Sequence, residues 1–159
     1  MEQDNFSINY ENYMEQSLTH VVRFALLDAE QRGIPSPHAF YISFITDYPG
    51  VQMPPFLKAK YPENITIVLQ YEFSNLKVSD KEFGVTLSFD GRPYYILVPF
   101  AAILSFVDPG VNFALQFPNH KKEFERIMAE ESLNGENQQE LPYNHEKIVS
   151  LDTFRKKKP

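Results

Sequence analysis

Histidines are the side chains in this 159-residue chain with the most obvious capacity for acid–base or metal chemistry. Imidazole carries protons near neutral pH and is a common zinc ligand. The four are not spaced as in a metal site, and the sequence has no cysteine to supply a thiolate. We therefore expect no metal and no cofactor. The histidines are His20, His38, His120 and His145.

Motifs for nucleophilic or phosphate chemistry are also missing. The six glycines are scattered and form no phosphate-binding loop, and no serine stands in a nucleophile elbow. Thr86 and Ser88 alternate along a predicted strand, as solvent-facing residues do. The carboxylates show no pairing that suggests catalysis. These observations favour a non-enzymatic protein and leave an unrecognised hydrolase as the weaker alternative. The carboxylates considered are Asp28, Glu30, Glu72 and Asp80.

The C-terminal residues 147–159 combine apolar side chains with cations. This pattern is typical of a short docking motif, because apolar side chains fill pockets on a partner while an extended backbone adds to a sheet edge. The alternative is a terminal strand that folds back on the body of the protein.

Charge is distributed unevenly along the chain. The formal net charge is −6, but five cations against Asp152 alone give residues 147–159 a charge of +4, which leaves −10 on the rest. An acidic body repels nucleic-acid phosphate. RNA binding by a small barrel is therefore the less favoured alternative.

The sequence also indicates a cellular location. The first residues, Met1 to Asp4, show neither the basic region nor the apolar run of a secretion signal. No stretch approaches the roughly 20 apolar residues that a membrane span needs. Absence of cysteine fits a reducing compartment. We expect a cytoplasmic protein with no membrane partner.

The first predicted element is a helix over residues 10–32, which ends at Gly33 and Pro35. Its apolar residues recur every three or four positions, and further apolar side chains lie beside that stripe. The wide apolar face indicates either a helix sunk deeply into its own domain, or one flank on the core and the other against a second subunit. The stripe is Met14, Leu18, Val21, Val22, Ala25 and Ala29.

From residue 38 onward the periodicity changes to two, which predicts strands. We expect a loop with Pro49-Gly50 and Pro54-Pro55 as turn and breaker signals, and then one strand from Ile65 to Phe73. A hairpin follows about Asp90-Gly91, with Pro93 indicating an edge strand. The fold class is α+β, with the N-terminal helix packed on a small, mostly antiparallel β-barrel or sandwich. Other predicted elements are strands at 40–44, 104–107 and 111–117 and a helical turn at 99–102.

After Pro118 the sequence becomes rich in Glu, Asn, Gln and Lys. Such a segment buries too little apolar surface to offset its ordering entropy. We predict a folded domain over 1–118, a mobile polar linker over 119–146, and a docking motif over 147–159. Helix-compatible patterning over 121–133 indicates that part of the linker is ordered.

Taken together, these segments resemble the SspB family, the stringent starvation protein B adaptors of the bacterial protease ClpXP, and its alphaproteobacterial branch most closely. The resemblance covers most of residues 10–118 and the C-terminal motif. It is carried by the sequences Arg32-Gly33-Ile34-Pro35, 61–70 (Tyr-Pro-Glu-Asn-Ile-Thr-Ile-Val-Leu-Gln), Phe89-Asp90-Gly91-Arg92-Pro93, Val98-Pro99-Phe100-Ala101-Ala102-Ile103, Phe113-Ala114-Leu115-Gln116-Phe117 and 148–157.

The resemblance implies a function without chemistry of its own. Members of the family bind the ssrA degradation tag in a groove, dock the zinc-binding N-terminal domain of ClpX through the C-terminal motif, and form homodimers. We expect such a dimer through the N-terminal helix. A mobile tether of about 28 residues would reach about 30 Å. A general peptide-binding module remains an alternative within the same fold.

For the tag groove, Gln70 is the most plausible residue, because an amide both donates to and accepts from a peptide backbone. Arg92 is expected to meet an acidic tag residue, and apolar walls are expected from nearby side chains, although ordinary core is the competing interpretation for each. The predicted walls are Val68, Phe89, Val98, Phe100 and Ala101. The predicted ClpX-docking residues are Val149, Leu151, Phe154, Arg155 and Lys156.

Overall fold

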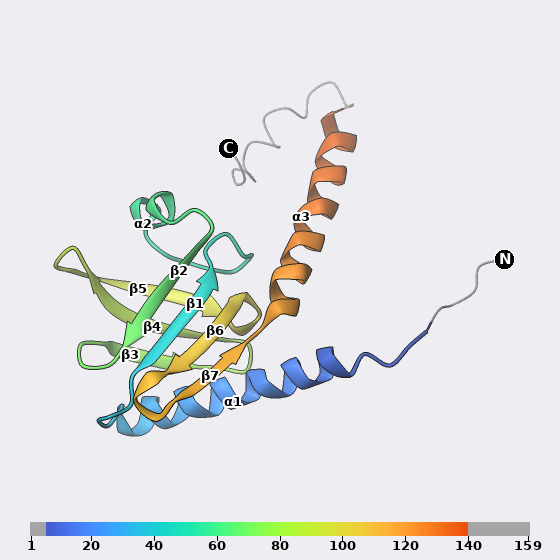
Figure 1. Ribbon diagram of the computed structural model, residues 1–159. Helices are drawn as coiled ribbons and strands as arrows, with labels where there is room; N and C mark the ends of the chain where they lie inside the picture. Colours follow the sequence, from blue (N-terminus) through green and yellow to red (C-terminus); the bar gives the residue numbers. More distant parts are fainter. Residues whose placement is uncertain (1–5, 140–159) are drawn as a thin grey trace. The chain divides into compact units, whose positions relative to one another are not determined.

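The computed structural model describes residues 6–139, with side chains as far as Leu133, and divides into units 1–121 and 122–159 (Figure 1). Its elements are α1 (Tyr10–Arg32), β1 (Phe40–Ile45), α2 (Pro55–Lys60), β2 (Asn64–Leu69), β3 (Ser74–Val78), β4 (Glu82–Phe89), β5 (Arg92–Pro99), η1 (Phe100–Ala102), β6 (Ile103–Asp108), η2 (Pro109–Val111), β7 (Phe113–Gln116) and α3 (Pro118–Gln139).

The strands of the first unit form two antiparallel sheets. One has the order β2-β1-β6-β7 and the other the order β3-β4-β5. Figure 1 shows α1 running along one side of these sheets. The α+β prediction is confirmed, and the described strands form two open sheets rather than one closed barrel.

The hydrophobic core lies between the inner faces of the two sheets and α1. Strict alternation along β2 buries Ile65, Ile67 and Leu69 and exposes the residues between them. Strand β1 buries Phe40, Ile42 and Phe44 on its inner face, and Ile45 at its end is buried as well. The side chains that meet them from the other elements include Val22, Leu26, Phe83, Val85, Ile96, Val98, Phe100, Ile103, Phe106 and Phe117.

Helix α1 has the bounds that the sequence predicts. Its N-cap is Asn9, whose side chain accepts a hydrogen bond from the Asn12 N–H at 3.1 Å. At the other end the Gly33 N–H donates to the Ala29 carbonyl at 2.8 Å. Val22 and Leu26 are fully buried on the inner face. The helix is thus capped at both ends and buried on one face.

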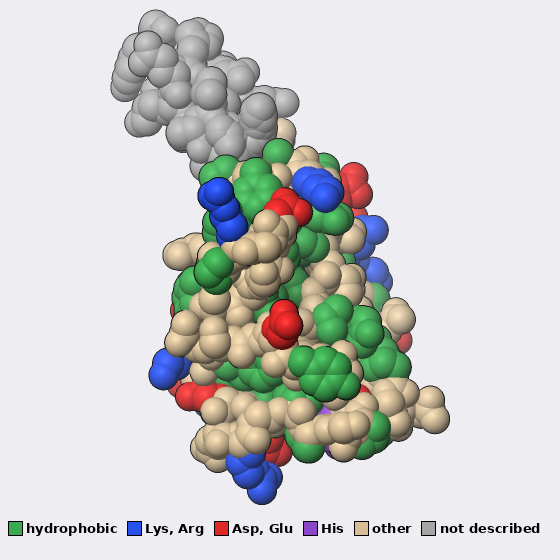
Figure 2. Space-filling view, turned by 90° about the vertical axis from the view of Figure 1, so that its left-hand side faces the viewer, with side chains coloured by type: hydrophobic (Ala, Val, Ile, Leu, Met, Phe, Trp, Pro, Cys, Tyr) green, Lys and Arg blue, Asp and Glu red, His purple; other side chains and the backbone are tan. Residues whose placement is uncertain are grey.

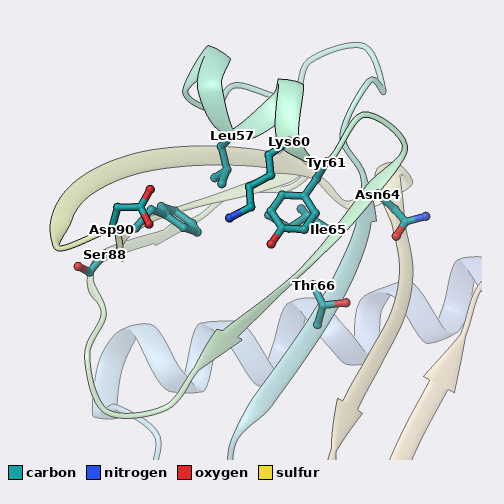
Figure 3. Close-up of a pocket in the computed structure, with 9 residues that line it drawn as sticks. Leu57, Lys60, Tyr61, Asn64, Ile65, Thr66, Ser88 and Asp90 are labelled. Carbon is teal, nitrogen blue, oxygen red and sulfur yellow. The ribbon is translucent and has the colours of Figure 1, made fainter.

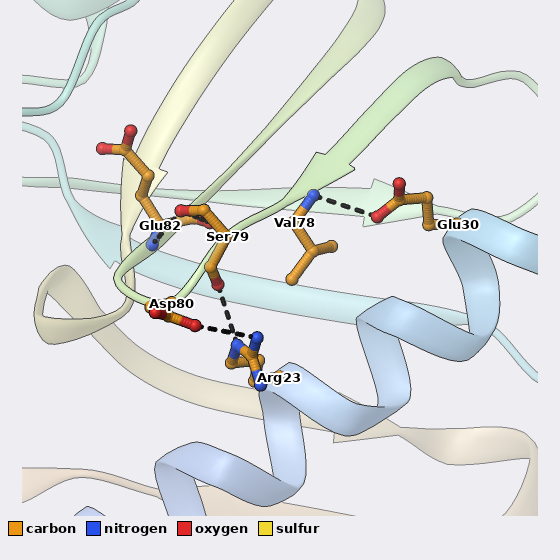
Figure 4. Close-up of polar contacts among 6 residues, drawn as sticks. All are labelled: Arg23, Glu30, Val78, Ser79, Asp80 and Glu82. Carbon is orange, nitrogen blue, oxygen red and sulfur yellow. Dashed lines mark hydrogen bonds and ion pairs between the residues drawn. The ribbon is translucent and has the colours of Figure 1, made fainter.

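A polar flank of α1 binds the turn between β3 and β4 (Figure 4). The Arg23 guanidinium donates to the Ser79 carbonyl at 2.8 Å and pairs with Asp80 at 3.1 Å. Further along the helix, the Glu30 carboxylate accepts from the Val78 N–H at 3.1 Å. These contacts fix the rotation of α1 about its own axis.

The β4–β5 hairpin confirms the predicted turn. Asp90 and Gly91 both have positive φ, at 53° and 79°, as a type I′ turn requires. The register places Phe89 opposite Arg92 and Ser88 opposite Pro93. Strand β5 lies at an edge of its sheet, as Pro93 predicts.

The predicted strand from Ile65 to Phe73 is wrong at its C-terminal end. Strand β2 stops at Leu69, and β3 begins at Ser74 in the other sheet. Tyr71, which lies beyond the end of β2, is 77% exposed. The alternation of apolar residues continues through residues 70–73, which connect the two sheets. The sequence pattern therefore did not indicate that the chain changes sheet there. Residues 55–60 were also expected in a loop but form α2, since a proline at the first helical position begins a helix as readily as it breaks one.

Helix α3 occupies most of the segment that we expected as a mobile linker. The helix-compatible patterning over 121–133 indicated part of it. Arg126 pairs with Glu123 and Glu130 at spacings of three and four residues, which stabilise a helix locally. The pairing with Arg126, chiefly its hydrogen bond, lowers the pKa of Glu123. None of the helices within residues 6–139 is long and apolar enough to span a membrane.

The start of α3 is held within the first unit. The carboxylate of Glu15, which is buried at 8% exposure, accepts from the Asn119 N–H with both oxygens at 3.2 Å. His120 stacks on Phe117 with ring centroids 4.9 Å apart, and its Nδ1 lies 2.7 Å from the Ile103 carbonyl. Because a carbonyl only accepts, His120 Nδ1 is the donor. We had expected His120 in a mobile tail, and no local sequence pattern indicated these contacts.

Candidate functional site

A cleft of about 520 Å³ opens between one edge of the first sheet and the hairpin of the second (Figure 3). Its walls come from three elements that are far apart in sequence: the C-terminal end of α2, the first half of β2, and the β4–β5 turn. The lining residues are Leu57, Lys60, Tyr61, Asn64, Ile65, Thr66, Ser88, Phe89 and Asp90.

The base of the cleft is apolar and rigidly supported. Leu57 and Ile65 are 4% and 6% exposed, so they present only an edge of the core to the opening. Phe89 is half-buried, and its ring lies 6.4 Å from that of Tyr94. Helix α2 is fixed by an ion pair at 3.1 Å between Lys58 and Asp47. An apolar side chain can enter this cleft without displacing its walls.

Charged side chains of opposite sign stand on opposite walls. Lys60 comes from the end of α2 and Asp90 from the hairpin turn (Figure 3). Neither forms an ion pair with another residue in the range 6–133; Lys60 Nζ lies 5.7 Å from the centre of the Tyr61 ring. Both charges are therefore available to a ligand, and their separation would favour one orientation of it.

The third wall is a free sheet edge. Strand β2 pairs with β1 and has no partner on its other side among the described strands. Alternate backbone N–H and C=O groups of an edge strand lack partners and can pair with another extended chain. Hydrogen bonds from the edge, with an apolar pocket beside it, are the elements of strand addition by a peptide.

The structure places one of the predicted groove residues, Phe89, in the lining of this cleft. Arg92 is exposed directly across the hairpin from Phe89 but does not line the cleft. Val68 is 40% exposed on the outer face of β2, beside Tyr41, and Gln70 follows the end of that strand. These two residues continue the line of β2 beyond the lined part of the cleft.

The other predicted walls lie elsewhere. Val98 is 0% exposed because the alternation along β5 points it into the core, and Phe100, the first residue of η1, is 3% exposed. They support the sheets and offer no surface to a ligand in this conformation. Ala101 is exposed on η1 and does not line the cleft. The five predicted ClpX-docking residues, Val149 to Lys156, lie outside the described residues.

Lys60, Tyr61 and Asn64 were missed as cleft residues. Tyr61 and Asn64 stand in the stretch that carries the family resemblance, but their side chains meet the hairpin only in three dimensions. Lys60 was missed because residues 55–60 were assigned to a loop. A proline pair followed by apolar and basic residues, 54–60, was the available signal for a short helix there.

The face shown in Figure 2 carries its charged side chains scattered among hydrophobic and uncharged ones. The lysine and arginine side chains drawn there do not merge into a broad basic surface. Within residues 6–139 no cluster of histidine, aspartate and glutamate could hold a metal ion. The geometry defines a small α+β binding domain with a free sheet edge and a partly apolar cleft.

Comparison with known families agrees with this class. The sequence model of the stringent starvation protein B family, SspB, matches residues 12–158. The chain belongs to this family. No curated protein sequence matches the chain. The family is one of non-enzymatic adaptors, so membership supports an adaptor role and a protein as the partner.

Proposed function

We propose that the chain captures ssrA-tagged polypeptides in the β2 cleft and delivers them to the ClpX unfoldase through residues 147–159. The free edge of β2 beside the cleft carries the proposal, because it offers backbone hydrogen bonds and a pocket to one extended peptide. Membership of the SspB family supplies the class of partner. The proposed setting is the bacterial cytoplasm.

The direct test is fluorescence anisotropy of a labelled ssrA-tag peptide titrated with the full-length protein. We expect saturable binding that unlabelled tag competes and a scrambled peptide does not. Flat anisotropy up to high micromolar protein would reject tag capture. Binding of a labelled RNA that persists after removal of residues 147–159 would favour the small-barrel alternative.

Lys60 offers a sharper test of the cleft. Lys60→Ala should weaken tag binding by up to about fivefold, the range for an exposed charge pair. Lys77→Ala is the matched control, because it removes the same charge from an exposed position on β3 that does not line the cleft. If both variants weaken tag binding equally, the loss of affinity reflects the change in net charge and not a contact in the cleft.

Gln70 tests how far the bound peptide follows β2. Gln70→Ala should weaken binding by about 0.5–3 kcal/mol, the range for losing a hydrogen bond or leaving its partner unpaired. Gln116→Ala, at the end of the opposite edge strand β7, is the control. An unchanged affinity in the Gln70 variant would confine the site to the lined part of the cleft.

Delivery is proposed to depend on residues 147–159. Their deletion should abolish ClpXP-dependent degradation of a tagged substrate and leave tag affinity unchanged. Tethering raises the local concentration of a cargo, with typical gains of about 10²–10⁴ in avidity. Helix α3 adds a spacer of 22 residues, about 33 Å at 1.5 Å per residue. Reduced tag affinity in the truncated protein would place the tail in the cleft instead.

A homodimer through α1 completes the proposal. The outer face of this helix exposes Tyr13, Met14 and Phe24 by 53%, 63% and 58%. Such a contiguous apolar face is typical of an interaction surface. Phe24→Glu should give a folded monomer in sedimentation at micromolar concentration. A wild-type protein that sediments as a monomer would reject the dimer.

A further inference from the structure

A second cavity, of about 630 Å³, lies at the C-terminal end of α1, away from β2. It is a pocket between α1, the loop before β1 and the edge strand β7. The proposed tag site does not use it. Its lining residues are mostly apolar, with three charged groups and a histidine among them: Ala25, Asp28, Ala29, Arg32, Gly33, Ile34, Pro35, His38, Phe40, Phe106, Asp108, Val111 and Phe113.

Three aromatic side chains form one wall of the pocket. The rings of Phe40 and Phe106 lie 4.9 Å apart, and Phe113 meets Phe106 edge-on at 6.4 Å. Behind them, the buried carboxylate of Asp108 holds His38 Nδ1 at 2.7 Å and the Ala39 N–H at 3.1 Å. With the wall fixed in this way, the pocket keeps its shape and suits bulky apolar side chains.

The exposed face of α1 leads directly to this pocket. Residues three or four apart share one flank of a helix, so Met14, Leu18 and Val21 continue into Ala25 and Arg32. Of the 16 large apolar side chains that are exposed within residues 6–133, seven lie between positions 6 and 24, and two more line the pocket. Exposed apolar surface is therefore concentrated on α1, on the segment before it and at the pocket.

At the opposite end of α1 is an apolar arm, residues 6–9, which precedes the helix. Phe6 is 76% exposed and Ile8 is 52% exposed. These side chains are too exposed to be held by their own chain. The pocket is at the other end of a helix about 34 Å long, at 1.5 Å for each of its 23 residues.

Two-fold symmetry brings the arm and the pocket together. In a two-fold symmetric dimer of identical chains, each contact occurs twice. If residue i of one copy contacts residue j of the other, residue j of the first copy also contacts residue i of the second. An antiparallel pair of α1 helices with its axis near Val21, the midpoint of residues 10–32, places Ile8 of one copy opposite residue 34 of the other. Ile34 lines the pocket. Antiparallel helices also oppose their dipoles favourably.

We propose that Phe6 and Ile8 of one copy fill the α1–β7 pocket of a second copy, so that each arm completes a site on its partner. This inference rests on the proposed dimer. It adds that the two α1 helices pair antiparallel and that Phe6 and Ile8 are the anchor residues. It is independent of tag capture, which uses the β2 cleft.

The absence of cysteine in the sequence allows a clean cross-linking test. Ile8→Cys protein is mixed with Val111→Cys protein and oxidised; both positions are exposed. We expect a disulfide-linked dimer from the mixture and none from Ile8→Cys alone. Ser88→Cys, exposed at the other cleft, replaces Val111→Cys in the control. Cross-linking of Ile8→Cys with itself, or equal yields with Ser88→Cys, would overturn the proposal.

Affinity gives a second, independent measurement. The double variant Phe6→Ser, Ile8→Ser should raise the dimer Kd by at least about 100-fold, since each dimer loses two buried apolar anchors at each of two sites. Tyr71→Ser is the matched control, because Tyr71 is as exposed as Phe6, at 77% against 76%, and lies in the β2–β3 connection. The control should keep the wild-type Kd.

The outcomes separate this inference from the proposals on which it rests. A wild-type monomer would reject the dimer and the arm contact together. A dimer whose Kd is unchanged in the double variant would reject the arm contact alone. Tag anisotropy in the same samples should stay at the wild-type value, and its loss in the double variant would contradict the separation of the two sites.

Discussion

Helices α1 and α3 have nearly the same length, 23 and 22 residues, but they are stabilised in different ways. Helix α1 buries Val22, Leu26 and Ala29 and binds the β3–β4 turn through its polar flank. No side chain of α3 up to Leu133 is buried, and Arg126 pairs with carboxylates of its own helix. Tertiary packing supports the first helix, and local interactions contribute to the second.

Truncating a buried side chain of α1 is expected to have the largest effect. Leu26→Ala should lower the free energy of unfolding by about 2–5 kcal/mol, because Leu26 has no exposed surface and the change leaves a cavity. Leu133→Ala in α3, where the side chain is 61% exposed, should change it by less than about 0.5 kcal/mol. Urea denaturation measures both, and similar losses would contradict the comparison.

Removing the carboxylate that links α1 to the start of α3 should have an intermediate effect. Glu15→Ala should cost about 0.5–2 kcal/mol, the range for losing a helix cap, because the Asn119 N–H loses its acceptor. Hydrogen exchange of the Asn119 amide should become faster. Glu11→Ala is the control, because it removes the same charge from the exposed first turn of α1. Asn119 exchange that is equally fast in both variants would exclude a specific role for the Glu15 contact.

Acidification should have the smallest effect and should act on α3. The folded pKa of Glu123 is below its usual value because Arg126 donates a hydrogen bond to its carboxylate. The Glu123–Arg126 pair therefore contributes to the stability of α3 above the ordinary glutamate pKa. This contribution is lost as the pH falls through the lowered folded pKa of Glu123. Far-ultraviolet circular dichroism should show a loss of helix on acidification that Arg126→Gln reduces. An equal loss in that variant would exclude this pair as the cause.

The sequence predicted best where one local signal decides the structure. The bounds of α1 follow from the apolar spacing and from Gly33, and the hairpin follows from Asp90-Gly91. It failed at residues 70–73, where alternation continued across a change of sheet, and at α2, where proline had two interpretations. Local periodicity does not report which sheet a strand joins.

The cleft was predictable only in part for the same reason. Phe89 and Arg92 were chosen from a hairpin whose register a tight turn determines. Lys60 faces that hairpin from a distant part of the sequence, and no pattern within α2 indicates the contact. Val98 and Phe100 were chosen for their apolar character, which the core uses.

The approach of η2 to the loop before β1 has a consequence for protein engineering. A β-carbon at Gly110 would lie 1.9 Å from the Pro37 carbonyl oxygen, and backbone cannot move aside cheaply. At Gly84 it would meet the Tyr95 hydroxyl at the same distance, but that side chain is 49% exposed and can rotate away. In a library randomised at both codons and selected for folding, position 110 should return glycine alone, whereas position 84 should admit alanine and serine.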